Sequence, residues 1–167
     1  MNNKFPQYTT DYISGVMSLR KPQEKSLKIL EKIMTSINIK KDMNLKVALG
    51  GVHALYPICS DFEREFMSLT FALATGVGKT RLMGAFISYL YTKHDIKNFF
   101  VVAPNTTIYE KLKRDLSDKS NPKYVFNGLG CFHTAPQIIS DDYNYGQISL
   151  FESDIRIFIF NIDKFNK

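Results

Sequence analysis

The stretch Ala74–Thr80, with the sequence ATGVGKT, constrains the fold of this chain more than any other feature. It follows a short apolar run, SLTFALA at 68–74, which predicts a strand buried on both faces. It precedes a segment from Lys79 to about Lys93 whose apolar residues recur at helical spacing, namely Leu82, Met83, Phe86, Ile87 and Leu90. Glycines in such a turn let consecutive backbone N–H groups point inward, and the helix N-terminus adds about half a positive charge. The sequence therefore predicts a loop that binds phosphate.

The residue types in this loop match the pattern that holds a nucleoside triphosphate. Lys79 is expected to reach the β- and γ-phosphates, and Thr80 to offer its hydroxyl to the Mg²⁺ that bridges them. These two are the predicted catalytic residues, and the predicted nucleotide-binding set is Thr75, Gly76, Val77, Gly78, Lys79, Thr80 and Arg81. The alternative is a glycine-rich turn with no ligand. Leu73 stands five positions before Gly78, where the general pattern has glycine.

Strand and helix patterns alternate around the loop. Residues 22–37 predict an amphipathic helix with Pro22 in its first turn, and 42–65 predict helix, loop and short helix. Gly84 is expected to let the helix after the loop approach a sheet closely. Further strands are predicted at 98–103, around 124–126 and at 154–161, and Thr107 with Glu110 has capping-box spacing for a helix between the first two. This order indicates an α/β fold with a mostly parallel sheet flanked by helices.

Composition excludes several classes of protein. With 44% hydrophobic and 23% charged residues in 167, the chain has the balance of a folded domain. It has no apolar run of roughly 20 residues and no secretory signal at its start, so we expect a soluble, cytoplasmic protein without a membrane partner. Cys59 and Cys131 lack metal or disulfide spacing and indicate structural thiols. His53, His94 and His133 likewise show no metal-ligand spacing.

Positive charge is concentrated near the N-terminus. Residues 1–60 carry 9 Lys and Arg against 4 Asp and Glu, whereas residues 121–167 carry 4 against 5. The lysines on or near the first predicted helix are Lys21, Lys25, Lys28 and Lys32, followed by Lys40, Lys41 and Lys46. They are interpreted either as a solvated helix face or as a surface that holds a phosphate backbone nearby.

The segment FALATGVGKTRLMGAFISYLY resembles the first motif of superfamily 2 helicases and translocases. More narrowly, DFEREF at 61–66, the loop and its helix, FFVVAPNTTIYEKLKRDL at 99–116 and IFIFNIDKF at 157–165 resemble the res subunit of type III restriction enzymes. The resemblance implies a partial RecA-like P-loop domain over 61–167, preceded by a helical leader at 1–60. It implies ATP and magnesium as cofactors, and double-stranded DNA and a modification (methyltransferase) subunit as partners.

The resemblance also assigns roles outside the loop. The run Leu19-Arg20-Lys21-Pro22-Gln23 is similar to the arrangement in which a glutamine reads the adenine edge, so Gln23 is an expected nucleotide contact. An exposed helix-start residue is the alternative. The second family motif falls on Pro104, Asn105, Thr106 and Thr107, which are expected to contact the DNA backbone. Thr107 has helix capping as its competing role.

A motor of this class needs a strand-end acidic pair, and the chain does not supply one plainly. Asp163 follows an apolar run but precedes Lys164, and Asp141-Asp142 lack a preceding strand. We therefore expect an N-terminal piece of a longer ATP-hydrolysing DNA translocase, ending before its acidic motif and inactive alone. The rival hypotheses are a small P-loop phosphotransferase with Asp163 or Asp141 at the metal, and a non-catalytic nucleotide-binding module.

Overall fold

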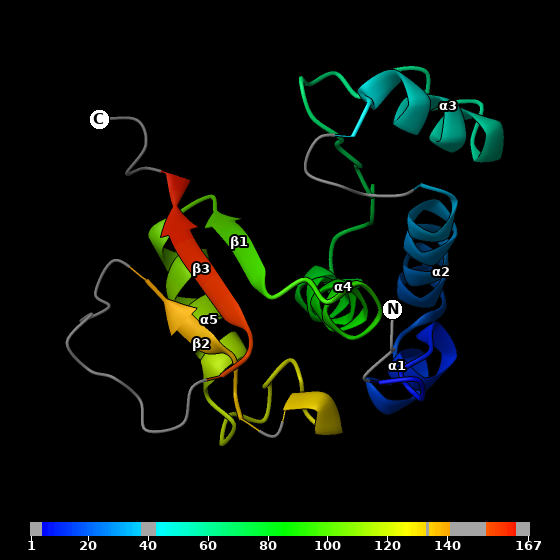
Figure 1. Cartoon of the computed structure of the whole chain (residues 1–167). Helices are drawn as coiled ribbons and strands as arrows, with labels where there is room; N and C mark the ends of the chain where they lie inside the picture. The colour runs from blue at the N-terminus through cyan, green and yellow to red at the C-terminus, as the bar shows by residue number, and fades with distance from the viewer. Residues whose placement is uncertain (1–4, 38–42, 133, 141–152, 163–167) are drawn as a thin grey trace. The chain divides into compact units, whose positions relative to one another are not determined.

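The computed structural model describes residues 5–37, 43–132, 134–140 and 153–162. They form five α-helices, a short 3-10 helix and a three-stranded sheet, which confirms the predicted α/β class (Figure 1). The chain divides into two compact units, one of residues Arg20–Lys79 and the other of Met1–Leu19 with Thr80–Lys167. None of the helices in the described ranges has both the length and the apolar character needed to cross a membrane.

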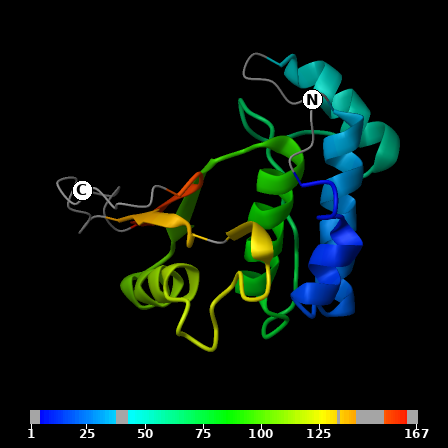
Figure 2. The ribbon, with the colours of Figure 1, turned by 60° about the horizontal axis from the view of Figure 1, so that its bottom comes forward.

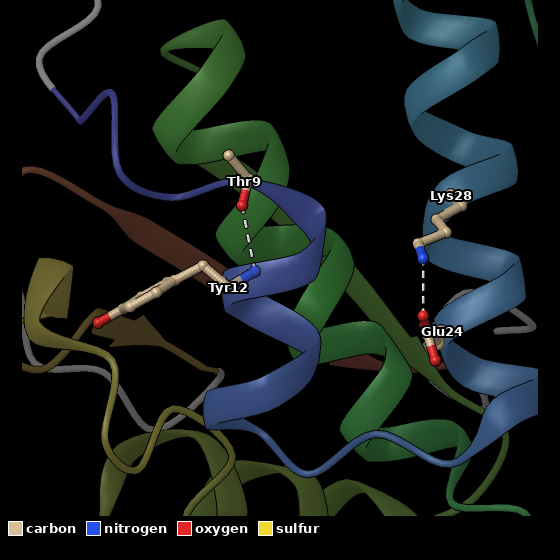
Figure 3. Close-up of polar contacts among 4 residues, drawn as sticks. All are labelled: Thr9, Tyr12, Glu24 and Lys28. Carbon is tan, nitrogen blue, oxygen red and sulfur yellow. Dashed lines mark hydrogen bonds and ion pairs between the residues drawn. The ribbon is translucent and has the colours of Figure 1, made fainter.

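The Arg20–Lys79 unit contains two helices, α2 (Lys21–Ser36) and α3 (Leu45–Leu55). Helix α2 confirms the helix predicted at 22–37: it has Pro22 in its first turn and buries an apolar face. Lys28 Nζ pairs with Glu24 Oε1 at 2.7 Å along this helix, and both side chains are partly exposed (Figure 3). Helix α3 begins after Asn44, whose side chain accepts from two backbone N–H groups. The helices share a core of Ile33, Ile37, Ala48, Val52 and Phe62.

Two expectations for this unit are wrong. No helix forms at 61–65, because Asp61 Oδ1 accepts from the Glu63 N–H at 3.1 Å and Glu63 takes a left-handed φ of 56°, which breaks a helix. Residues 68–74 are not a buried strand either. Their side chains alternate between half-buried and exposed, and they pair with no strand in the described ranges. Several of them instead line a groove of about 920 Å³ together with residues of α2 and α3.

The other unit starts with α1 (Thr10–Val16), which the sequence analysis did not predict. Thr9 caps this helix by accepting from the Tyr12 N–H at 3.1 Å (Figure 3). Helix α4 (Lys79–His94) confirms the helix expected after the glycine loop, but not its single apolar face, because Met83, Phe86 and Leu90 are only half-buried and residues on other faces are buried. An aromatic cluster fills part of the core, with Tyr91 stacked on Phe132 and Phe126 against the same ring.

The sheet consists of β1 (Asn98–Ala103), β2 (Gln137–Ile139) and β3 (Arg156–Asn161). The order is β1-β3-β2 and both pairings are parallel, as the alternation of helices and strands predicted. Helix α5 (Thr106–Ser117) packs against all three strands and lies along one face of the sheet (Figure 2). Strand β1 was expected to be buried throughout, but Phe100 is 69% and Val102 53% exposed. In the described ranges α5 covers one face only, so alternate residues stay accessible.

The strand expected around 124–126 is also absent. Residues 125–128 form a turn, yet Tyr124, Val125 and Phe126 are all buried. They are held from α5, because the Val125 N–H donates to the Asp115 carbonyl at 2.9 Å. A Cβ added to Gly84 of α4 would lie 1.9 Å from Val125 Cγ1. The close approach expected at Gly84 therefore exists, but its partner is this loop and not the sheet.

The buried thiol of Cys131 lies in the 3-10 helix Gly130–Phe132. Burial raises its pKa to about 12, so the thiol stays protonated and unreactive near neutral pH. The neighbouring Tyr8 is buried as well, and burial raises the pKa of its hydroxyl to about 12. Cys131 is thus a structural residue.

Candidate nucleotide-binding site

The predicted phosphate loop is a turn whose two glycines both have left-handed backbone. Gly76 has a φ of 79° and Gly78 a φ of 92°, conformations that other residues adopt at a cost. A Cβ at Gly76 would meet no atom within 4 Å, whereas one at Gly78 would lie 2.8 Å from Gln23 Nε2. Glycine is therefore required by conformation at 76, and by conformation and space at 78. The chain passes from this turn directly into α4, which begins at Lys79.

Two side chains from the start of α2 hold the carbonyl groups of these glycines. Gln23 Nε2 donates to the Gly78 carbonyl at 2.8 Å, and Arg20 Nη1 donates to the Gly76 carbonyl at 3.1 Å. The same glutamine accepts from the Arg20 N–H through Oε1 at 2.7 Å, which gives a partner to a backbone N–H group at the start of α2. Gln23 is only 1% exposed. The alternative of an exposed helix-start residue is thus wrong for Gln23.

Lys79 lies at the mouth of the loop. Its side chain is exposed, and its Nζ donates to the carbonyl of Ala74 at 3.3 Å, so the ammonium group reaches back along the loop. The side chains of Thr75 and Lys79 both face solvent. An exposed turn with a lysine and a helix N-terminus, and with open space beside Gly76, fits a phosphate group.

The two residues after Lys79 differ in their surroundings. Thr80 is half-buried in the first turn of α4. The Arg81 side chain is exposed, but its Nη1 donates to the carbonyl of Met17 at 2.9 Å. Met17 ends α1, so the guanidinium satisfies a carbonyl at a helix C-terminus, where positive charge is stabilising. In this structure Arg81 therefore joins α4 to α1, and its expected nucleotide contact stays a prediction.

The second predicted contact segment, 104–107, connects β1 to α5. All four side chains are exposed. Asn105 is the cap of α5, because its Oδ1 accepts from the Ile108 N–H at 2.9 Å. The capping role expected for Thr107 with Glu110 is therefore wrong, since the helix begins earlier, at Thr106, and Thr107 already lies inside it. DNA contact by these residues stays a prediction.

Sequence reasoning missed Asn161, which the structure places beside this segment. Asn161 ends β3, is 6% exposed, and donates from Nδ2 to Thr106 Oγ1 at 3.1 Å. The signal was a polar residue directly after the apolar run IFIF, at the carboxyl end of a parallel strand, where functional side chains gather. This bond joins the end of β3 to the start of α5, the helix that follows the neighbouring strand β1.

The acidic residues considered for the metal, Asp141, Asp142 and Asp163, lie outside the described residues, as does His133. Within the described ranges, no three His, Cys, Asp or Glu side chains gather as a metal site. His94 contacts Tyr89 Oη at 3.2 Å, and burial lowers the His94 pKa below 6.5. Of the residues predicted to bind magnesium, Thr80 is the one that lies within the described ranges.

A parallel α/β fold, with a Gly-x-Gly-Lys-Thr turn opening a helix, places the chain in the class of RecA-like P-loop proteins. Comparison with protein families then gives a match to the family described as type III restriction enzyme, res subunit, over residues 16–167. The chain belongs to this family. Comparison with curated proteins and with solved structures finds no match. Domains of this helicase-like family bind ATP.

Proposed function

We propose that this chain is the ATP-binding part of a DNA translocase, the res subunit of a type III restriction enzyme. The observation that carries the proposal is the loop at 75–79, whose two left-handed glycines curl the backbone in front of an exposed lysine. Family membership over residues 16–167 supports the same conclusion. In this proposal ATP hydrolysis drives movement along double-stranded DNA.

The residues of the loop have distinct roles in binding. The backbone N–H groups of 76–80 and the start of α4 hold the phosphate oxygens, and Lys79 neutralises the β- and γ-phosphates. Thr80 offers its hydroxyl to Mg²⁺, which when bound neutralises charge on the same phosphates. Thr75 and Val77 take part in the loop through their backbone groups.

The DNA-facing part of the proposal concerns 104–107. Asn105, Thr106 and Thr107 present amide and hydroxyl groups that suit phosphate oxygens of a DNA backbone, and all three side chains are exposed. Of the basic residues near the N-terminus, Lys21, Lys25 and Lys32 are exposed on α2. A modification subunit would read the recognition sequence, and cleavage would follow translocation.

Calorimetric titration of the 167-residue chain with MgATP tests the central part of this function. Lys79→Ala should weaken binding about tenfold or more, since a hydrogen bond to a charged group contributes roughly 1.5–3 kcal/mol. Lys123→Ala, which removes an exposed lysine far along the chain from the loop, is the matched control and should bind as the parent does. Equal affinity of the Lys79→Ala variant and the parent would refute the proposal.

Turnover separates the proposal from a self-contained phosphotransferase. The translocase account expects weak binding of ATP and little hydrolysis by the 167-residue chain without DNA. Rapid ATP hydrolysis without DNA, or phosphate transfer to a small acceptor, would favour the phosphotransferase instead.

A further inference from the structure

We propose that Gln23, together with Arg20, is a positioning residue of the phosphate loop, and that it controls the affinity for polyphosphate whatever base is attached. The inference rests on the proposed function, because it assumes that the loop binds a nucleotide. It adds a role for Arg20, and it gives Gln23 a role different from reading adenine.

The side chains of Arg20 and Gln23 set the direction of two peptide groups in the phosphate loop. In a trans peptide the C=O and the following N–H point in opposite directions. The Gly76 carbonyl is held by Arg20 Nη1 at 3.1 Å, so the N–H of Val77 faces away from that guanidinium. The Gly78 carbonyl is held by Gln23 Nε2 at 2.8 Å, so the N–H of Lys79 faces away from that amide. Two side chains of α2 thus fix the direction of two N–H groups that phosphate oxygens would use.

The Gln23 side chain is buried, and its amide already has hydrogen-bond partners. Its side chain is 1% exposed, with Oε1 occupied by the Arg20 N–H and Nε2 by the Gly78 carbonyl. Because the amide is buried, a base arriving from solvent could reach it only after the side chain had moved, and that movement would disturb both bonds. Leaving the Gly78 carbonyl and the Arg20 N–H without partners carries a cost that opposes this movement.

Gln23 and Gly78 pack closely against one another. A Cβ at Gly78 would lie 2.8 Å from Gln23 Nε2, so the glutamine amide packs directly against the bare Cα of the second glycine. Glycine at 78 therefore serves the contact with α2 as well as the left-handed φ of 92°. The phosphate loop and the start of α2 are therefore in close contact within this unit.

The experiment compares a ligand that has adenine with one that has no base. MgATP and magnesium tripolyphosphate are titrated into the parent chain and into Gln23→Leu, which keeps the side-chain size but removes both hydrogen bonds. A positioning role predicts that both affinities fall by the same factor, about five- to tenfold for a bond contributing roughly 1 kcal/mol or more. A fall for MgATP alone would mean that Gln23 reads adenine, and would overturn the inference. Unchanged affinities would overturn it as well.

Arg20→Met provides a second variant, because Arg20 is exposed and its loss leaves the core intact. It should lower both affinities in the same proportion, whereas Arg20→Lys should restore part of the loss. Ser26→Ala, one turn along α2 and bonded only to the Pro22 carbonyl among the contacts described, is the control for general weakening of the helix. Thermal melting of each variant gives the fraction of chains that is folded. A purely structural role would lower the melting temperature and leave the affinity of the folded chains unchanged, and this result would overturn the inference.

Failure of the inference and failure of the proposed function give different results. If the parent binds neither ligand, or if Lys79→Ala binds both as the parent does, the proposed function fails and the inference fails with it. If the parent binds and Lys79→Ala does not, while Gln23→Leu and Arg20→Met both bind as the parent does, the inference alone fails.

Discussion

At Gly84, helix α4 passes so close to the 124–126 loop that no side chain fits between them. Its absent Cβ would overlap Val125 Cγ1 at 1.9 Å, and Val125 Cβ would lie at 3.3 Å. The sequence predicted the close approach because a glycine in a helix usually has a packing reason. It did not predict the partner, since the 124–126 segment reads as a strand locally and its position depends on a bond to the distant Asp115.

Gly84→Ala should lower the free energy of unfolding by about 1–3 kcal/mol, the usual cost of overpacking a core. Val125→Ala removes the overlapping methyl group but leaves a cavity, so it should also be destabilising alone. The double variant Gly84→Ala/Val125→Ala should be more stable than the sum of the two single effects predicts. Urea denaturation of all four proteins measures this, and simple additivity would show that α4 does not contact the loop at this point.

At the scale of elements, the start of α5 shows what a local sequence pattern can predict about a helix and what it cannot. The sequence predicted the helix correctly, and it placed the cap two residues too late because Thr107 and Glu110 have the spacing of a capping box. The actual N-cap is Asn105, because it precedes the first helical residue and its side chain accepts from the Ile108 N–H. Both residue types are good caps, and only the backbone geometry distinguishes them.

Asn105→Ala should therefore destabilise the protein by about 1 kcal/mol, the typical loss of a helix cap. Thr107→Ala should change stability by no more than a few tenths of a kcal/mol, since alanine is the better helix former at an interior exposed position. Thermal or urea unfolding compares the two. A larger loss for Thr107→Ala than for Asn105→Ala would restore the capping box as the correct description.

Strands were predicted less well than helices. The strand predicted at 98–103 is present, and the one predicted at 154–161 is present as Arg156–Asn161. Their apolar runs are longer than that of β2, which has only 3 residues and was missed. The runs at 68–74 and 124–126 have strand composition but no strand pairing in the described ranges. A strand forms only when it pairs with another strand, often far away in the sequence, and the composition of a segment does not identify that partner.

At the scale of the whole molecule, the turn and the helix of the candidate site were more predictable than the contacts around them. The helix after the loop was predicted from one heptapeptide and its flanks, and the family from that stretch together with 61–66, 99–116 and 157–165. Phosphate binding by the loop itself stays a prediction. What the sequence could not predict were the long-range partners of that site. Arg20 lies 56 residues before Gly76, and Asn161 lies 55 residues after Thr106.

The central claim is that the backbone amides of the glycine loop hold a polyphosphate. Nitrogen-15 NMR of the 167-residue chain, titrated with MgATP, tests it at the atoms concerned. The account predicts that the largest shifts occur at the N–H groups of Gly76, Val77, Gly78, Lys79 and Thr80, and that Lys79→Ala makes them markedly smaller at the same ligand concentration. Saturable shifts elsewhere in the chain, with these five amides unmoved, would contradict it.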